Sequence, residues 1–456
     1  MAGIGFELRK LFRQDTYWGV LRAYTYAGII SSGPWLLSII GIMLLGILSS
    51  PIVFPSFLIT QFQTCLTYLI ALSLILTGTI QLALTRYISD RLFEHDRRRV
   101  LPNFNGTILL TTGVSGLLAY PAAILLFPEQ SVVFRLLLGG CFVVLSNIWI
   151  ATILLSGLKN YRAIVAYFAL GYGLTVITGM LLRPFGLEGL MGGFFIGQFV
   201  LLMGLYFTIC HAYPSDRFVE FDFLHRKRLP AFLIIPGICY NAGIWMDKFV
   251  FWFNPATSQS IIGPLRASLI YDLPIFLAYL SIVPGMAVFL VRMETDFVEF
   301  YDKFYDAVRE GGSLQYIREM HDEMVRTARE GIFDIMKIQS LAILVCILAG
   351  PATLRALGIS ELYLPLLYVD VVSAGLQVVL LGLLNINFYL DRRPRVLLLT
   401  VLLLVLNLLF TALSIMLGPY YFGYGFAAAL LVTVVVGMVL LNRDFELLEY
   451  ETFMLQ

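Results

Sequence analysis

Charged residues are scarce in this sequence of 456 residues. Asp, Glu, Lys and Arg together make up 13% of the chain, about half the share that is typical of a soluble domain. No charged residue occurs between Ala23 and Thr85 or between Val396 and Asn442. A helix that crosses a bilayer needs about 20 predominantly apolar residues, so each run is long enough for two such helices. The chain is therefore predicted to be an all-α integral membrane protein.

The sequence also lacks the motifs of common enzymes and metal sites. It contains no nucleotide-binding loop, no nucleophile elbow and no paired acids in a soluble segment. Its cysteines lie inside apolar segments without the spacing of metal ligands, and its histidines form no cluster. The net charge of +1 gives no indication of nucleic-acid binding. We therefore expect no enzyme activity, no cofactor and no metal site.

What the sequence has in abundance is long apolar windows, bounded by charged or Pro/Gly-rich breaks. These windows predict about twelve transmembrane helices. They cover residues 25–48, 57–83, 105–127, 133–156, 163–182, 189–210, 230–252, 271–291, 333–352, 363–386, 396–418 and 422–441. If the N-terminus is cytoplasmic, 26 of the 31 Lys and Arg residues lie on the cytoplasmic side of the membrane. The other five lie within the membrane or on its opposite side, and they are Arg135, Arg183, Lys248, Arg266 and Arg355. Because basic residues concentrate on the cytoplasmic side, both termini are expected there.

The predicted helices suggest two six-helix bundles around a central cavity, with a cytoplasmic helical insertion between the eighth and ninth helices. The expected parts are an amphipathic N-terminal segment (1–24), a six-helix bundle (25–215), a linker with helices seven and eight (216–291), the insertion (292–331), helices nine to twelve (332–441) and a cytoplasmic tail (442–456). The first helix of each half contains a break, at Gly33–Pro34 and at Pro236–Gly237. Paired breaks are typical of transporters with internal repeats, so we interpret these four residues as hinges.

The insertion contains a strongly amphipathic segment. Five aromatic residues share one helical face at spacings of three and four residues, namely Phe297, Phe300, Tyr301, Phe304 and Tyr305. The opposite face is charged, and Gly311–Gly312 ends the segment. Two interpretations follow. The face lies on the membrane or on the protein itself, or it docks a cytoplasmic partner.

Ionisable residues at membrane depth are the candidate site. Such groups cost several kcal/mol unless they pair or contact water. The candidates for a substrate path or for ion coupling are Asp247, Lys248, Asp370, Asn241, Tyr240, Trp245 and Arg135. Each also has a structural interpretation: Arg135 and Lys248 could reach the membrane surface, and the two acids could form bonds between helices. The aromatic residues around Trp245 fit an interfacial belt or a surface on which sugar rings stack.

The N-terminal sequence resembles a known family. Met1–Lys10 (MAGIGFELRK), Tyr26–Gly28 and Ser31–Trp35 (SSGPW) are similar to the PelG family of Pel exopolysaccharide transporters, and the resemblance covers the whole chain in length and helix count. That family is similar to flippases and multidrug exporters of the MOP superfamily, which have two six-helix bundles around a cavity. No residue-level motif of the family is carried over to this sequence.

The resemblance implies export of Pel, an N-acetylhexosamine-rich biofilm polymer, across the inner membrane of a Gram-negative bacterium. It also implies partners: a cytoplasmic glycosyltransferase and two inner-membrane proteins, one of them a receptor for cyclic di-GMP. Three alternatives remain open. They are a lipid-linked oligosaccharide flippase, a multidrug or cation antiporter that uses Asp247 or Asp370, and a membrane scaffold that anchors a polysaccharide synthase.

Overall fold

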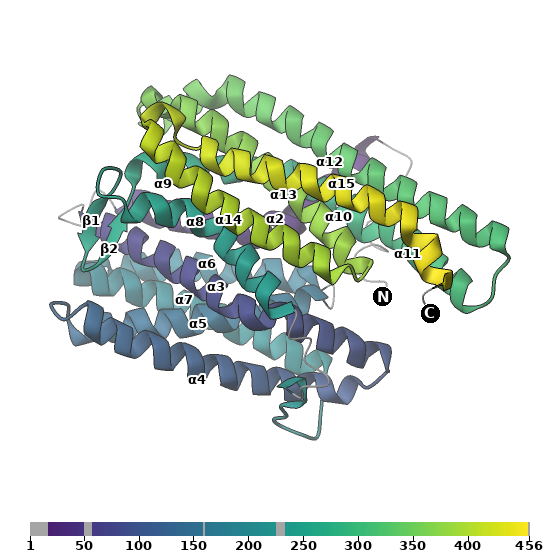
Figure 1. Cartoon of the computed structure of the whole chain (residues 1–456). Helices are drawn as coiled ribbons and strands as arrows, with labels where there is room; N and C mark the ends of the chain where they lie inside the picture. Colours follow the sequence, from purple (N-terminus) through teal and green to yellow (C-terminus); the bar gives the residue numbers. More distant parts are fainter. Residues whose placement is uncertain (1–16, 50–56, 158–159, 225–232, 455–456) are drawn as a thin grey trace. The chain divides into compact units, whose positions relative to one another are not determined.

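The computed structural model describes residues 17–49, 57–157, 160–224 and 233–454 (Figure 1). The chain forms two compact units, Met1–Ser32 with Leu269–Gln456, and Gly33–Ser268. The N-terminal motif Met1–Lys10 lies outside the described residues. Nearly all described residues are helical, as long apolar windows require, because a bilayer offers backbone groups no other hydrogen-bond partner.

The unit Gly33–Ser268 contains most of the first half of the chain. Its helices are the second part of α2 (Tyr17–Ser49), α3 (Phe57–Phe93), α4 (Val100–Leu126), α5 (Val132–Gly157), α6 (Tyr161–Leu182), α7 (Gly186–Ala212) and α8 (Ile234–Phe253). Phe62, Phe134 and Phe194 are buried in its apolar core. Helices α6 and α7 pack along their length (Figure 1), and the chain reverses between them at Gly186, whose φ of +65° favours glycine.

The second unit contains the remaining helices. They are α9 (Leu269–Tyr279), α10 (Val283–Val291), the π-helix η6 (Arg292–Phe297), α11 (Val298–Arg309), α12 (Leu314–Ala356), α13 (Leu364–Tyr389), α14 (Arg393–Leu417) and α15 (Tyr424–Met454). The 3₁₀ turn Leu280–Ile282 joins α9 to α10, so residues 269–309 form one continuous helical segment. Helix α13 packs on both α12 and α15.

Among the described residues, nine helical segments are long and apolar enough to cross a membrane. The two bent parts of α2 together would form a tenth span. One of the nine, Arg162–Ala212, contains both α6 and α7, which pack side by side. Helix α8 is not among the nine. The chain is thus a multi-pass helical membrane protein, and the exact number of twelve spans stays a prediction.

The segment 292–331 is helical on both sides of Gly311–Gly312, and its location as a cytoplasmic insertion stays a prediction. Residues 292–309 continue α10 through η6 and α11, and residues 314–331 are the first part of α12. The turn around Gly311, which has a φ of +70°, lies where the sequence predicted a break. Likewise, most of the predicted tail 442–456 continues α15 to Met454. These extensions exist because the amphipathic pattern allows the helices to continue beyond their apolar windows.

A small β-hairpin was not predicted. Strands β1 (Gln259–Ile262) and β2 (Leu265–Ala267) pair antiparallel, and Gly263 occupies the tight turn with a φ of +52°. The dipeptide Gly263–Pro264 is a turn signal in the sequence. Tyr68 of α3 donates its hydroxyl to the carbonyl oxygen of Arg266 at 2.9 Å, which fixes the hairpin to the helix.

Helix α2 is bent by 63° between Tyr24–Gly33 and Leu36–Ile42, and Pro34 lies at the bend. A proline inside a helix removes one backbone hydrogen bond and kinks the helix. The boundary between the compact units also falls here, after Ser32. The bend fits the predicted break at Gly33–Pro34, and motion about it stays a prediction.

Candidate functional site

The first turn of α8 crosses α3 at very short range. A methyl group on Gly237 would lie 2.1 Å from the carbonyl oxygen of Gly78, and one on Gly78 would lie 2.6 Å from Nδ2 of Asn241. Asn241 donates from the same Nδ2 to the carbonyl oxygen of Gly237 at 3.1 Å. Pro236 lies in the first turn, where a helix accommodates proline without a kink. Gly237 therefore lies at a helix–helix contact, and the role of Pro236–Gly237 as a hinge stays a prediction.

Two turns further along α8, two charged residues are buried together. Asp247 is 0% exposed and Lys248 is 1% exposed. The Lys248 ammonium lies 2.9 Å from Oδ2 and 3.2 Å from Oδ1 of Asp247, and it also donates to the carbonyl oxygen of Ile244 at 3.1 Å. An isolated charge in an apolar interior is very costly, whereas a hydrogen-bonded pair compensates most of that cost. The pair places polar groups inside the unit without adding net charge.

An aromatic cluster surrounds this pair. The Tyr68 ring of α3 stacks on Trp252 at 4.5 Å, and Phe249 meets Trp252 edge-on at 5.2 Å. The Lys248 ammonium lies 5.6 Å from the centre of the Trp245 ring, within range of a cation–π interaction. Tyr68 and Trp252 are buried by one another and by their neighbours. Their faces are thus occupied by protein, so neither ring is available for stacking on a sugar.

Trp245 differs from the other rings in its polar atom. The side chain is 3% exposed, and its indole N–H has no hydrogen-bond partner among the described residues. A buried donor of this kind usually binds water or a ligand. Tyr240, two turns before the buried pair, is half-buried. The structure therefore brings Asn241, Trp245, Asp247 and Lys248 together on one helix that packs against α3.

Arg135 has a local structural role. It lies in the first turn of α5, and its guanidinium donates to the carbonyl oxygen of Gln130 at 3.0 and 2.8 Å and to that of Pro128 at 3.4 Å. These carbonyls belong to the turn between α4 and α5. These contacts hold the guanidinium at the turn, and a role of Arg135 in a substrate path stays a prediction.

Asp370 belongs to the other compact unit. It lies in the second turn of α13 and is 0% exposed. A methyl group on Gly423, whose φ is +85°, would lie 3.0 Å from Oδ1 of Asp370. Glycine at this position therefore lets the start of α15 approach the carboxylate closely. Asp370 and Asp247 lie in different compact units.

The aromatic face of α11 is covered by the chain itself. Phe297 and Phe304 are 0% exposed. Phe297 contacts Tyr389 at the end of α13, and Phe304 contacts His321 of α12. The prediction that these two side chains dock a partner is therefore wrong, because both are used in internal packing. Phe300, Tyr301 and Tyr305 are half-buried, and their contact with a partner stays a prediction.

A polar cluster at η6 was missed by the sequence reasoning. Arg292 donates to Asp296 at 2.9 Å and to Asp334 of α12 at 2.7 Å. Glu294 accepts hydrogen bonds from Asn385 and Tyr389 of α13, each at 3.1 Å. π-Helices are rare and often mark functional sites. The alternating charges Arg292, Glu294 and Asp296 directly after an apolar helix were the available signal.

Within the described part of the chain, no group of three or more His, Cys, Asp or Glu side chains could hold a metal ion. Charge at the candidate site is instead provided by Asp247 and Lys248.

The fold is similar to that of transporters of known structure. An outward-facing multidrug resistance MATE family transporter of the MOP superfamily aligns with a TM-score of 0.65 and 15% sequence identity, over 93% of this chain and 96% of that chain. A MOP superfamily transporter from Pyrococcus furiosus aligns with a TM-score of 0.63 and 14% identity, over 93% and 96% of the two chains. An inward-facing multidrug resistance MATE family transporter aligns with a TM-score of 0.59 and 13% sequence identity, over 91% of this chain and 95% of that chain. At these identities the likeness shows the fold alone.

The sequence itself has no match among curated proteins. A family model does match, over residues 1–453, and its description reads "PelG: Putative exopolysaccharide Exporter (EPS-E)". This match covers all but the last three residues of the chain. The predicted resemblance and the predicted MOP-like fold are thereby confirmed, and the chain belongs to the PelG family of exopolysaccharide exporters.

Proposed function

We propose that this chain exports Pel, an N-acetylhexosamine-rich exopolysaccharide, across the bacterial inner membrane during the formation of a biofilm matrix. The observation that carries the proposal is the family match over residues 1–453, together with a transporter fold over 93% of the chain. The absence of an ATP-binding motif from the sequence fits a pump that uses an ion gradient or the push of polymer synthesis.

The buried groups of α8 suit a polymer without net charge. Acetylation removes the charge of a hexosamine, so its path needs hydrogen-bonding groups more than a strong electric field. Asp247 and Lys248 compensate each other at 2.9 Å, and the buried N–H of Trp245 is a donor to which a hydroxyl or a water molecule could bind. We assign Asn241, Trp245, Asp247 and Lys248 to the substrate path on this basis, and we assign Asp370 to it in the other unit because of its burial.

A partner would supply the polymer. The implied partners are a cytoplasmic glycosyltransferase and inner-membrane Pel proteins that include a cyclic di-GMP receptor. We propose that the glycosyltransferase contacts the hairpin between α11 and α12. Leu314 and Tyr316 are exposed there, at 56% and 45%, and α11 carries the charged residues Lys303 and Arg309. A synthase at this hairpin would release its product beside the exporter.

Deletion of the gene in its own bacterium tests this function. Secreted N-acetylhexosamine polymer, detected with a lectin, should disappear, and expression of the wild-type chain should restore it. The variant Asp370→Ala should fail to restore secretion while reaching the wild-type level in the membrane. Unchanged secretion in the deletion strain would refute the proposal, and loss of the variant protein itself would favour a structural role for Asp370.

A second candidate function is antiport of a cationic drug or an ion. It is favoured by the fold similarity to MATE transporters and by the buried carboxylates of Asp247 and Asp370. In that case the chain, purified and reconstituted into vesicles, should exchange a cationic dye for protons or Na⁺ in the absence of any partner. The export proposal expects no such exchange.

A further inference from the structure

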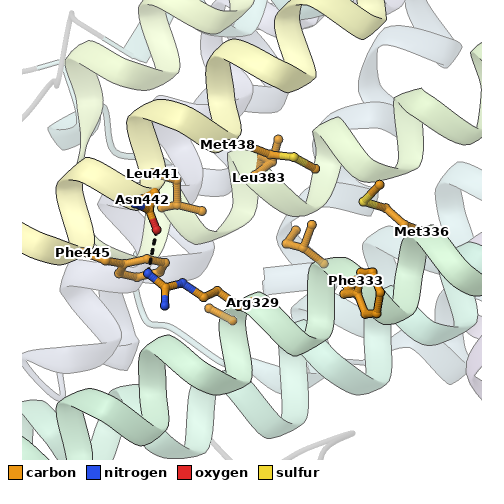
Figure 2. Close-up of a pocket in the computed structure, with 10 residues that line it drawn as sticks. Arg329, Phe333, Met336, Leu383, Met438, Leu441, Asn442 and Phe445 are labelled. Atoms are coloured by element: carbon orange, nitrogen blue, oxygen red, sulfur yellow. Dashed lines mark hydrogen bonds between the residues drawn. The ribbon is translucent and has the colours of Figure 1, made fainter.

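A pocket lies between α12 and α15, on the same unit as Asp370 but formed by other residues. Its volume is about 260 Å³, and its lining includes Phe333 and Met336 of α12 and Met438, Leu441 and Phe445 of α15. Figure 2 shows Arg329 and Asn442 at one end of this apolar lining, joined by a hydrogen bond. The pocket therefore combines an apolar groove with a polar end.

The groove opens onto an apolar surface of α12. Phe333 at its edge is 57% exposed, and Leu341 and Leu344 are exposed further along the same helix. The most apolar window of α12 is only 17% buried within the protein, although its hydropathy is that of a membrane span. Exposed apolar side chains on a spanning helix contact lipid tails. The groove is thus accessible to acyl chains of the bilayer.

The polar end of the groove carries positive charge. Arg329 Nη2 donates to Oδ1 of Asn442 at 2.6 Å, and Arg329 takes part in no ion pair among the described residues. Most nearby acids are already engaged: Asp334 by Arg292 and Lys337, and Asp444 by Arg395. The remaining acid beside the groove is Glu446, which accepts a hydrogen bond from Asn442. Arg329 is therefore the charged side chain that lines the polar end of the groove.

We infer that this groove binds one anionic phospholipid of the surrounding bilayer, with its phosphate at Arg329 and an acyl chain between Phe333 and Met438. A basic pocket at the cytoplasmic end of transmembrane helices is the usual binding site for an anionic headgroup. Arg329 lies on the side that the distribution of Lys and Arg predicts to be cytoplasmic. The apolar lining fits an acyl chain, because it offers a lipid no polar group beyond the arginine end.

Native mass spectrometry of the purified chain tests this inference. In a titration with phosphatidylglycerol or phosphatidylcholine, one phosphatidylglycerol molecule should bind in preference. The variant Arg329→Gln should weaken that binding about fivefold, as expected for one cation near a membrane surface. The matched control is Arg326→Gln, one turn away on α12, because Arg326 already pairs with Glu323 and Glu330. Equal losses in both variants would overturn the inference.

A second variant tests the groove without a change of charge. Met438→Trp should fill the groove and release the lipid, whereas inorganic phosphate should not compete with it. Phosphatidylglycerol binding that survives both Met438→Trp and Arg329→Gln would refute the site. Tighter binding of a polyprenyl phosphate, or a dimer that covers the groove, would overturn the choice of occupant. None of these measurements depends on transport, so their outcome is independent of the export proposal.

Discussion

At the scale of single residues, the most unusual feature is an ion pair between chain neighbours. Successive residues of a helix point about 100° apart, and side chains at i and i+1 do not normally face each other. Lys248 nevertheless reaches Asp247 because its long stem folds back toward the carbonyl of Ile244. The sequence predicted that Asp247 would avoid lipid. It could not predict this partner, because rotamers of a long side chain depend on the surrounding packing.

The pair predicts an asymmetric response to mutation. Asp247→Ala should lower the free energy of unfolding by about 3–5 kcal/mol, because it leaves a buried ammonium without the carboxylate at 2.9 Å. The double variant Asp247→Ala with Lys248→Met should recover much of this loss, since it removes both charges. Denaturant unfolding of the three proteins in detergent measures the difference. Equal destabilisation of the single and double variants would contradict a compensating pair.

At the scale of elements, the position of α8 depends on two glycines. Gly237 and Gly78 allow the backbones of α8 and α3 to touch, since a methyl group on Gly237 would lie 2.1 Å from a carbonyl oxygen. Small residues at helix crossings are a common device in membrane proteins. The sequence singled out Pro236–Gly237 and interpreted it as a hinge. Glycine alone does not distinguish a hinge from a close contact, and the partner Gly78 carries no signal of its own.

Alanine at these glycines should destabilise the crossing. Gly237→Ala is expected to cost about 1–3 kcal/mol through overpacking against α3. Gly113→Ala in α4 is the matched control, because its methyl group would meet nothing within 4 Å. Thermal unfolding in detergent should therefore separate the two variants. Similar melting temperatures for both would contradict the close contact.

For α11, the sequence predicted an amphipathic face but not its packing partner. Its amphipathic face was predicted from the spacing of Phe297, Phe304 and their neighbours, and the face exists. Periodicity reveals that a face must be covered, but it contains no information about what covers it. Here Tyr389 and His321 of the same chain cover it.

Near the hairpin between α11 and α12, buried side chains are expected to contribute to stability and exposed ones to partner binding. Phe304→Ala should cost about 3–5 kcal/mol of stability, because the ring is fully buried. Leu314→Ser combined with Tyr316→Ser should leave stability unchanged, because both side chains are exposed, and should reduce co-purification of the glycosyltransferase. Undiminished co-purification with the double variant would rule out docking at this hairpin.

At the scale of the whole molecule, composition predicted the class of protein and the resemblance predicted the family. The compact units were not predictable, because one boundary falls inside α2, after Ser32, and the other after Ser268. The predicted boundaries at 215 and 291 differ from these, since α8 packs on α3 at a contact that no charge or turn signal marks. Long-range contacts of this kind depend on side-chain shape rather than on local pattern.

Both ends of the chain are predicted to lie in the cytoplasm. The distribution of Lys and Arg requires this orientation. Reporter fusions at Gln456 and after Arg309 should be active only as cytoplasmic reporters, and a fusion at Pro128 only as a periplasmic one. A periplasmic signal at Gln456 would contradict the orientation.

Transport of the polymer is the central claim, and inside-out membrane vesicles test it most directly. Vesicles that contain the glycosyltransferase and this chain are supplied with labelled nucleotide-sugar, and a glycoside hydrolase is then added outside. The account predicts that newly made polymer is protected inside the vesicles only when this chain is present. It also predicts less protection with the double variant Asp247→Ala, Lys248→Met at equal protein level. Polymer that is protected equally without the chain would contradict export by this protein.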